Sequence, residues 1–205
     1  MINRRTIQNA FFSLVCAVLL SGCVQPWTLI DKDHRISSNG AFQVTLPVGW
    51  MQANMLNSVY YVKRDKYNVP LRVDRITLTR DGFPLQDMDF IRFDARYALP
   101  NLNKPYSANM LPSEAADLWV ADLKQAGLAS LKVHSNEPAT IAGNTGFKLH
   151  VSYKNARGLQ IERLIYGFGH KSGFYILNYE APSLHYFPEN RNTFIETVNS
   201  FRLVG

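Results

Sequence analysis

The sequence predicts a single α+β domain in which helices pack against a mainly antiparallel sheet. Several segments alternate apolar and polar residues, which is the pattern of half-buried strands. Short turns separate three such segments in the second half, and short turns favour antiparallel neighbours. Other segments repeat apolar residues at the spacing of one helix face. The chain of 205 residues is long enough for one core of ordinary domain size.

The first strand is predicted over residues 42–46, where Phe, Val and Leu alternate with polar residues before Pro47. The residues before it, 24–39, have two interpretations. They form a tether, or residues 27–36 form an edge strand that turns at "SSNG" and pairs with the next strand.

Two more strands are expected over residues 58–63 and 71–79. In the second of these, Asp74 and Arg75 interrupt the alternation, which predicts a β-bulge. The first half is therefore expected to be mostly sheet.

Two helices are predicted next. Residues 86–98 carry apolar side chains three or four positions apart and acids in the first turn. The second helix begins with Ser113 as its N-cap and ends at Gly127. Its apolar stripe consists of Ala116, Trp119, Val120 and Leu123.

The second half returns to sheet. Residues 147–154, 160–168 and 174–181 are predicted to form an antiparallel meander with short turns between them. Pro188 opens a last helix. The apolar face of that helix consists of Phe194, Ile195, Val198 and Phe201.

The N-terminal residues 1–22 are typical of a signal peptide. Arg4 and Arg5 form a positively charged n-region, residues 10–20 form a short apolar region, and small residues follow. A membrane-spanning helix needs about 20 apolar residues, and this run is roughly half that length.

The sequence Leu20-Ser21-Gly22-Cys23 resembles the lipobox of bacterial lipoproteins. The resemblance implies cleavage before Cys23 and acylation of its sulfur and its new amino group, so that several acyl chains anchor the protein in a membrane. The other cysteine, Cys16, lies in the segment that is removed. The mature chain therefore has no thiol left for an internal disulfide or a cysteine metal site.

The domain boundaries that follow are 1–22 for the signal peptide, 23–39 for the lipidated N-terminus and tether, and 40–205 for the globular domain. Removing Arg4 and Arg5 leaves 22 − 2 = 20 basic and 16 acidic side chains, a net charge of 20 − 16 = +4. This balance is mild, and it argues against nucleic acid as a partner.

Two stretches, "AFQVTLPVGW" at 41–50 and "GFYILNYEAPSLHYFPENRNTFIETVNSFR" at 173–202, resemble the PsbP-like family. The resemblance implies an α/β/α sandwich around an antiparallel sheet. Its members include bacterial lipoproteins and extrinsic accessory proteins of photosystem II, most with a binding or assembly role. The family offers no catalytic residues to carry over to this chain.

Residues with catalytic or metal chemistry do not form a recognisable motif. The five histidines lack metal-ligand spacing, and "YGFGHKSG" at 166–173 is interpreted as a hairpin turn because it lacks the Gly-Lys-Ser/Thr order of a phosphate loop. Asp87, Asp89 and Asp94 are interpreted as helix-dipole partners and solvated residues, not as a carboxylate cluster. We therefore expect no cofactor, no metal site and no catalytic residue.

The candidate partner-binding residues are Arg92, Arg96 and Tyr106. The two arginines lie one helical turn apart on the predicted helix, where they can serve an anionic partner. Tyr106 is expected to be exposed on the long loop 99–111, and tyrosine is a residue type that suits interfaces. A basic group in the predicted hairpin region consists of Lys63, Arg64, Lys66, Arg72, Arg75 and Arg80.

The function expected from the sequence is a membrane-anchored envelope lipoprotein with a non-catalytic binding or assembly domain. Its partners are the lipid membrane, through acylated Cys23, and a protein or envelope component. Because Val24 and not aspartate follows Cys23, sorting of the enteric type would place it on the outer membrane, facing the periplasm. The alternatives are an envelope hydrolase with an unrecognised site and a lipid or small-ligand carrier.

Overall fold

The protein is described from a computed structural model. The residues it describes are 27–204 apart from 39, 54–72, 81–84, 95–98, 100, 103 and 108. The helices in this part are α2 (Pro112–Gln125) and α3 (Tyr186–Ser200). The strands are β1 (Trp27–Leu29), β2 (His34–Ser38), β3 (Phe42–Leu46), β4 (Met51–Ala53), β5 (Val73–Arg80), β6 (Gln86–Asp94), β7 (Ala129–Ile141), β8 (Asn144–Lys154), β9 (Gln160–His170), β10 (Gly173–Pro182) and β11 (Arg202–Leu203).

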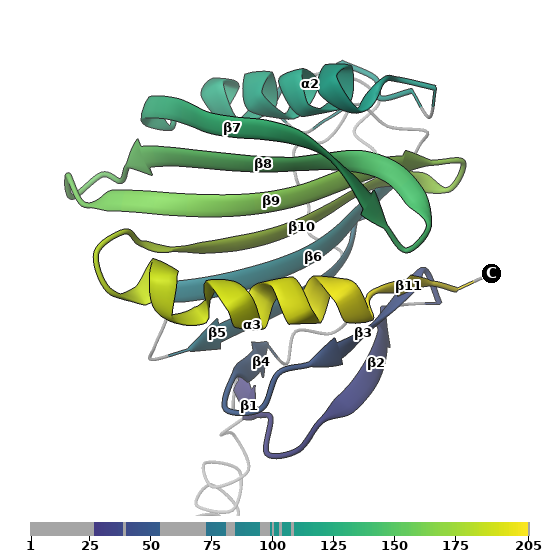
Figure 1. Cartoon of the computed structure of the whole chain (residues 1–205), viewed down its shortest axis with the longest axis vertical. Helices are drawn as coiled ribbons and strands as arrows, with labels where there is room; N and C mark the ends of the chain where they lie inside the picture. Colours follow the sequence, from purple (N-terminus) through teal and green to yellow (C-terminus); the bar gives the residue numbers. More distant parts are fainter. Residues whose placement is uncertain are drawn as a thin grey trace, which may run out of the picture.

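The strands form two sheets (Figure 1). The larger one has eight strands in the order β1-β4-β5-β6-β10-β9-β8-β7, and the smaller one has three in the order β11-β3-β2. Every pairing between neighbouring strands is antiparallel. The meander predicted for the second half is confirmed, since β8, β9 and β10 pair in sequence order. The fold is α+β, as expected.

One face of the larger sheet is covered by α3 and the smaller sheet (Figure 1). Their apolar side chains share one core, to which β3 contributes Phe42, Val44 and Leu46, the sheet contributes Phe90, Phe168 and Leu177, and α3 contributes Phe194 and Val198.

A buried polar network fixes α3 on this face. The single proton of the Tyr179 hydroxyl lies between two acceptors, the Gln86 side-chain oxygen at 3.0 Å and the Tyr186 carbonyl at 2.6 Å. Asn190 donates to the same Gln86 oxygen at 2.8 Å. Buried polar groups that are satisfied in this way specify one arrangement of helix and sheet.

The other face is covered by α2, which packs on β7, β8 and β9. Its buried residues Ala116, Trp119 and Leu123 belong to the predicted stripe. The helix begins at Pro112 with Leu111 as its N-cap, so the predicted cap at Ser113 is wrong by two positions. Gly127, at a φ of 85°, ends the helix as predicted.

The described part of the loop 99–111 contacts α2 and contributes two buried side chains, Leu99 and Tyr106, to the core under this helix. Leu99 is buried, and the Asn101 and Leu102 backbone amides donate to the Asp122 carboxylate on α2 at 2.8 Å. Tyr106 is only 8% exposed and stacks on Phe174 with 4.6 Å between ring centroids. The expected exposure of Tyr106 is therefore wrong, because its ring completes the core under α2.

The predicted helix over 86–98 is wrong for the part that the structure describes. Residues 86–94 form β6, which pairs with β5 and β10 without a register shift. Met88 and Ile91 are spaced as on a helix, but Phe90 and Phe93 fill the positions of a strand whose two faces are both buried. Residues 95–98 lie outside the described residues.

The predicted bulge at Asp74 and Arg75 is also wrong. The register between β5 and β6 is continuous, and Asp74 is fully buried on the same face as Ile76 and Leu78. Arg92 on the paired strand forms an ion pair with it. The alternation therefore continues with a paired charge in place of an apolar residue.

At the N-terminal end, the edge-strand interpretation is confirmed for residues 34–36, which pair with β3, and the strand continues to Ser38, into the predicted turn. Residues 27–29 pair with β4 instead. The strand predicted over 58–63 lies outside the described residues. No helix in the described part of the chain is long and apolar enough to cross a membrane.

The strand β7 is an element that the sequence pattern does not predict. It is an edge strand of 13 residues in which residues 132–134 and 136–138 are all exposed, so it lacks an alternating apolar pattern. Two register shifts interrupt its pairing with β8.

We predict that Gly169→Ala destabilises the domain through Tyr106. A Cβ at position 169 would overlap the Tyr106 hydroxyl oxygen, so the ring must move, at a cost of about 1 to 3 kcal/mol. Tyr106→Phe should be neutral or stabilising, because the buried hydroxyl has no hydrogen-bond partner among the described residues.

Urea unfolding of both single variants and of the double variant measures this contact. Gly169→Ala should cost less when it is combined with Tyr106→Phe, since the atom that it meets first is then gone. An equal cost of Gly169→Ala with and without Tyr106→Phe would contradict the contact.

Candidate functional site

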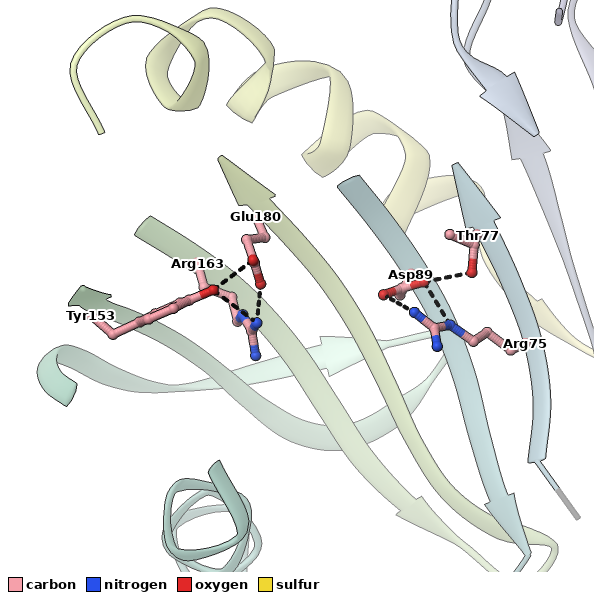
Figure 2. Close-up of polar contacts among 6 residues, drawn as sticks. All are labelled: Arg75, Thr77, Asp89, Tyr153, Arg163 and Glu180. Atoms are coloured by element: carbon pink, nitrogen blue, oxygen red, sulfur yellow. Dashed lines mark hydrogen bonds and ion pairs between the residues drawn. The ribbon is translucent and has the colours of Figure 1, made fainter. Parts of the chain in front are cut away.

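A strip of polar side chains lies on the α2 face of the larger sheet, beyond the apolar core under α2. It is formed by β5, β6, β8, β9 and β10. Its members are Arg75, Thr77, Asp87, Asp89, Tyr153, Arg163, Asn178 and Glu180, and we call this set the charged strip. Figure 2 shows six of them.

The strip arises because two adjacent strands change from apolar to polar side chains along the face that is covered by α2. On β10, Phe174 and Ile176 face α2, and the next positions on that face are Asn178 and Glu180. On β6, which runs antiparallel, Asp87 pairs with Glu180, while Phe93 pairs with Phe174. Register therefore brings the polar ends of both strands together.

The first half of the strip is centred on Asp89. Arg75 donates from Nε to Asp89 Oδ1 at 2.8 Å and from Nη2 to Oδ2 at 2.6 Å (Figure 2). The Thr77 hydroxyl donates to Oδ1 at 2.7 Å. This two-pronged geometry fixes the plane of the guanidinium relative to the carboxylate.

The second half is centred on Glu180. The Tyr153 hydroxyl donates to Glu180 Oε1 at 2.6 Å, and Arg163 Nη2 donates to Oε2 (Figure 2). Arg163 Nη2 also lies 3.4 Å from the Tyr153 oxygen. Burial raises the pKa of the Tyr153 hydroxyl, which therefore stays protonated as a donor.

Three polar atoms of the strip are buried and have no hydrogen-bond partner among the described residues. They are Asp87 Oδ1, Arg163 Nε and Asn178 Oδ1. Asn178 is 8% exposed and pairs with Asp89 across the strands, next to Asp87 and Glu180. A buried polar atom without a partner costs about 1 to 3 kcal/mol. The strip therefore contains two acceptors and one donor that the described residues leave unsatisfied.

Asp87 is the acidic residue of the strip for which the described residues show no ion pair. Its pKa is raised to about 7, mainly by burial and also by the nearby charges of Asp89 and Glu180, while a hydrogen bond with Thr79 opposes the shift. Near neutral pH this carboxyl group changes its protonation state, so it can act as a donor or as an acceptor.

A second polar cluster lies on the α3 face, where His134 Nε2 is 2.7 Å from the Ser152 hydroxyl and His150 Nε2 is 2.5 Å from Glu162. The two imidazoles are 4.8 Å apart, and burial followed by the charge of His150 lowers the pKa of His134. A Ser-His-acid triad requires a carboxylate bonded to the histidine, and within the described ranges none bonds to His134. In the same ranges, no group of three His, Cys, Asp or Glu side chains could hold a metal ion.

Two of the predicted binding residues, Arg92 and Tyr106, lie on opposite faces of the larger sheet. Arg92 lies on β6 on the α3 face, where it binds Asp74 and donates to the Ser172 carbonyl at 3.1 Å. Tyr106 is buried under α2. Arg96 and Cys23 lie outside the described residues.

Most residues of the strip are not singled out by the sequence pattern, because they are ordinary in their local sequence. The usable signal is Asn178 and Glu180 in "GFYILNYEAP", two polar positions on one face of a strand that is otherwise almost wholly buried. The two aspartates of β6 stand out in the sequence, but the helical interpretation assigns them to a helix terminus.

We predict that Asp87→Asn changes how stability depends on pH. The folded protein holds the Asp87 proton to about pH 7, whereas the ordinary pKa is 3.8, so the native carboxylate lowers stability as the pH rises through this interval. The asparagine side chain does not titrate, so the variant lacks this loss of stability at higher pH. The variant should match the wild type at about pH 4 and be more stable above about pH 7, by a few kcal/mol at most, since one pKa unit corresponds to about 1.4 kcal/mol.

Thermal unfolding of both proteins across this pH range tests the prediction. Asp117→Asn on the exposed surface of α2 is the matched control for the same chemical change outside the strip. A constant offset between Asp87→Asn and the wild type at every pH would contradict it.

No protein-family model matches the chain, and no curated protein matches it. Solved structures do. The cyanobacterial PsbP protein (CyanoP) of Synechocystis sp. PCC 6803 superposes with a TM-score of 0.55 at 11% identity, over 89% of this chain and 96% of that one. The Ran-binding protein Mog1p of Saccharomyces cerevisiae gives a TM-score of 0.52 at 12% identity, over 84% and 96%. The chain has a fold of the PsbP and Mog1 type.

Proposed function

We propose that this protein is a lipid-anchored protein of the cell envelope whose domain binds a protein partner through the charged strip and has an accessory, non-catalytic role. The observation that carries the proposal is the presence of three buried polar atoms without partners among the described residues, all within one half-buried group of charges.

The chemistry of the strip favours a polypeptide as the bound group. Asp87 Oδ1 and Asn178 Oδ1 need donors, and Arg163 Nε needs an acceptor. Peptide groups and side-chain amides supply both kinds. The ion pairs with Asp89 and Glu180 hold the arginines in place before binding, which reduces the entropy lost on association.

The anchor is proposed from the sequence. The charged n-region, the short apolar run and Leu20-Ser21-Gly22-Cys23 support acylation of Cys23. Val24 at the next position supports the outer membrane, with the domain facing the periplasm.

Proteins with a similar fold give general support to a binding role. Mog1p is a Ran-binding protein, and CyanoP is a PsbP protein. This fold therefore presents a protein-binding surface in at least one protein whose backbone resembles that of this chain.

We predict that the double variant Asp87→Asn with Asn178→Ala loses its partner while remaining folded. The two changes alter the unsatisfied acceptors and leave the ion pairs of Asp89 and Glu180 intact, so the melting temperature should not fall. In-cell crosslinking of the full-length protein, followed by mass spectrometry, identifies the partner. Its recovery with the double variant should drop at least about tenfold, which corresponds to about 1.4 kcal/mol.

The matched control is Asp117→Asn with Asn192→Ala, at exposed positions on α2 and α3, which should keep the partner. Unchanged recovery with the strip variant, at equal protein levels, would contradict the assignment of the strip.

A further prediction concerns the anchor. Cys23→Ala should release the protein from membranes or block its processing, because the acyl chains and not the core hold it there. The released domain should still unfold in one cooperative transition. Membrane fractionation and the mass of the mature N-terminus measure the first effect. An unmodified Cys23 in the wild-type protein would contradict the anchor.

A further inference from the structure

The end of the domain next to Cys23 carries exposed apolar side chains. Leu29 on β1 is 60% exposed, and Val48 in the turn after β3 is 51% exposed. Two hydrogen bonds join these segments: Ile30 donates to the Trp50 carbonyl at 2.8 Å, and Gly49 donates to the Ile30 carbonyl at 2.9 Å. We call residues 27–33 and 47–49 together the β1 end.

Few residues separate Cys23 from the β1 end, so the chain limits the distance between them. The described residues begin with Trp27 in β1, four residues after Cys23. Consecutive Cα atoms are about 3.8 Å apart, so the two residues are separated by at most about 15 Å. The sequence alone allows a tether over 23–39, but β1, β2 and the residues between them place residues 27–38 in the folded domain. An acylated Cys23 would therefore hold the β1 end at the lipid headgroups.

We propose that the β1 end rests on the bilayer that holds the anchor, with Leu29 and Val48 inserted at the level of the headgroups. This inference rests on the proposed acylation of Cys23. In Figure 1 β1 lies near the bottom of the described part of the chain and α2 at its top, so α2 would lie far from the membrane.

The chemistry of the β1 end fits a lipid surface. Trp27 is half-buried, and tryptophan is a residue type enriched at membrane interfaces. Within the β1 end Asp31 and Asp33 flank Lys32, so this surface carries no excess of basic charge. Contact therefore depends on apolar insertion, and we expect it to change little with salt concentration.

Depth-dependent fluorescence quenching tests the orientation. The mature chain has no thiol besides Cys23, so Val48→Cys gives one reactive site in the full lipidated protein. Leu111→Cys is the matched control, because Leu111 is 62% exposed next to α2, at the opposite end. Each variant is labelled with an environment-sensitive fluorophore and reconstituted into phosphatidylethanolamine and phosphatidylglycerol vesicles that carry headgroup nitroxide quenchers.

The probe at position 48 should be quenched several-fold more strongly than the probe at 111, at low and at high salt. Equal quenching in a preparation whose mass shows an acylated Cys23 would overturn the orientation and leave the proposed anchor intact. A mass that shows an unmodified Cys23 would overturn the anchor, and the bilayer contact with it. The two failures are therefore distinguishable.

Discussion

The structure depends on the burial of both faces of β10. Nine of its ten residues are buried, and only Glu180 is partly exposed. A strand with two buried faces needs a cover on each side. The smaller sheet and α3 provide one cover, and α2 with Leu99 and Tyr106 provides the other. The apolar half of the α2 face ends where β10 changes from Ile176 to Asn178. The charged strip therefore begins where the apolar core under α2 ends.

Charges placed beside a core are stable only when they are paired. The desolvation of an ion often exceeds its attraction to a partner, so apolar residues of the same volume would serve stability as well or better. Here Arg75 and Arg163 are each held by a carboxylate, yet Asp87 has no such partner in the described ranges and its pKa is raised by its burial. Departures of this kind from the most stable solution are typical of functional surfaces.

The sequence predicts an element well where one face of that element is exposed to solvent and the other is buried. β3, β8 and β9 alternate or end at clear turns, and α3 carries a distinct apolar stripe, so each is predicted with nearly correct bounds. The pattern fails for β6, whose two buried faces remove the alternation, and for β7, whose edge position leaves it mostly polar. The strip could not be predicted, because Asp87 and Glu180 are 180 − 87 = 93 positions apart and meet only through the register of β6 and β10.

The polar, irregular character of β7 has a consequence for the behaviour of the chain in a crowded compartment. A free edge of 13 residues is a template on which another strand can add, and from there aggregation can start. Pro138 removes one donor from this edge, Lys132 and Glu137 place charges along it, and two register shifts between residues 129 and 135 disturb its regular row of amides. The polar, irregular sequence of β7 prevents its prediction as a strand, and the same property opposes the addition of another strand to this edge.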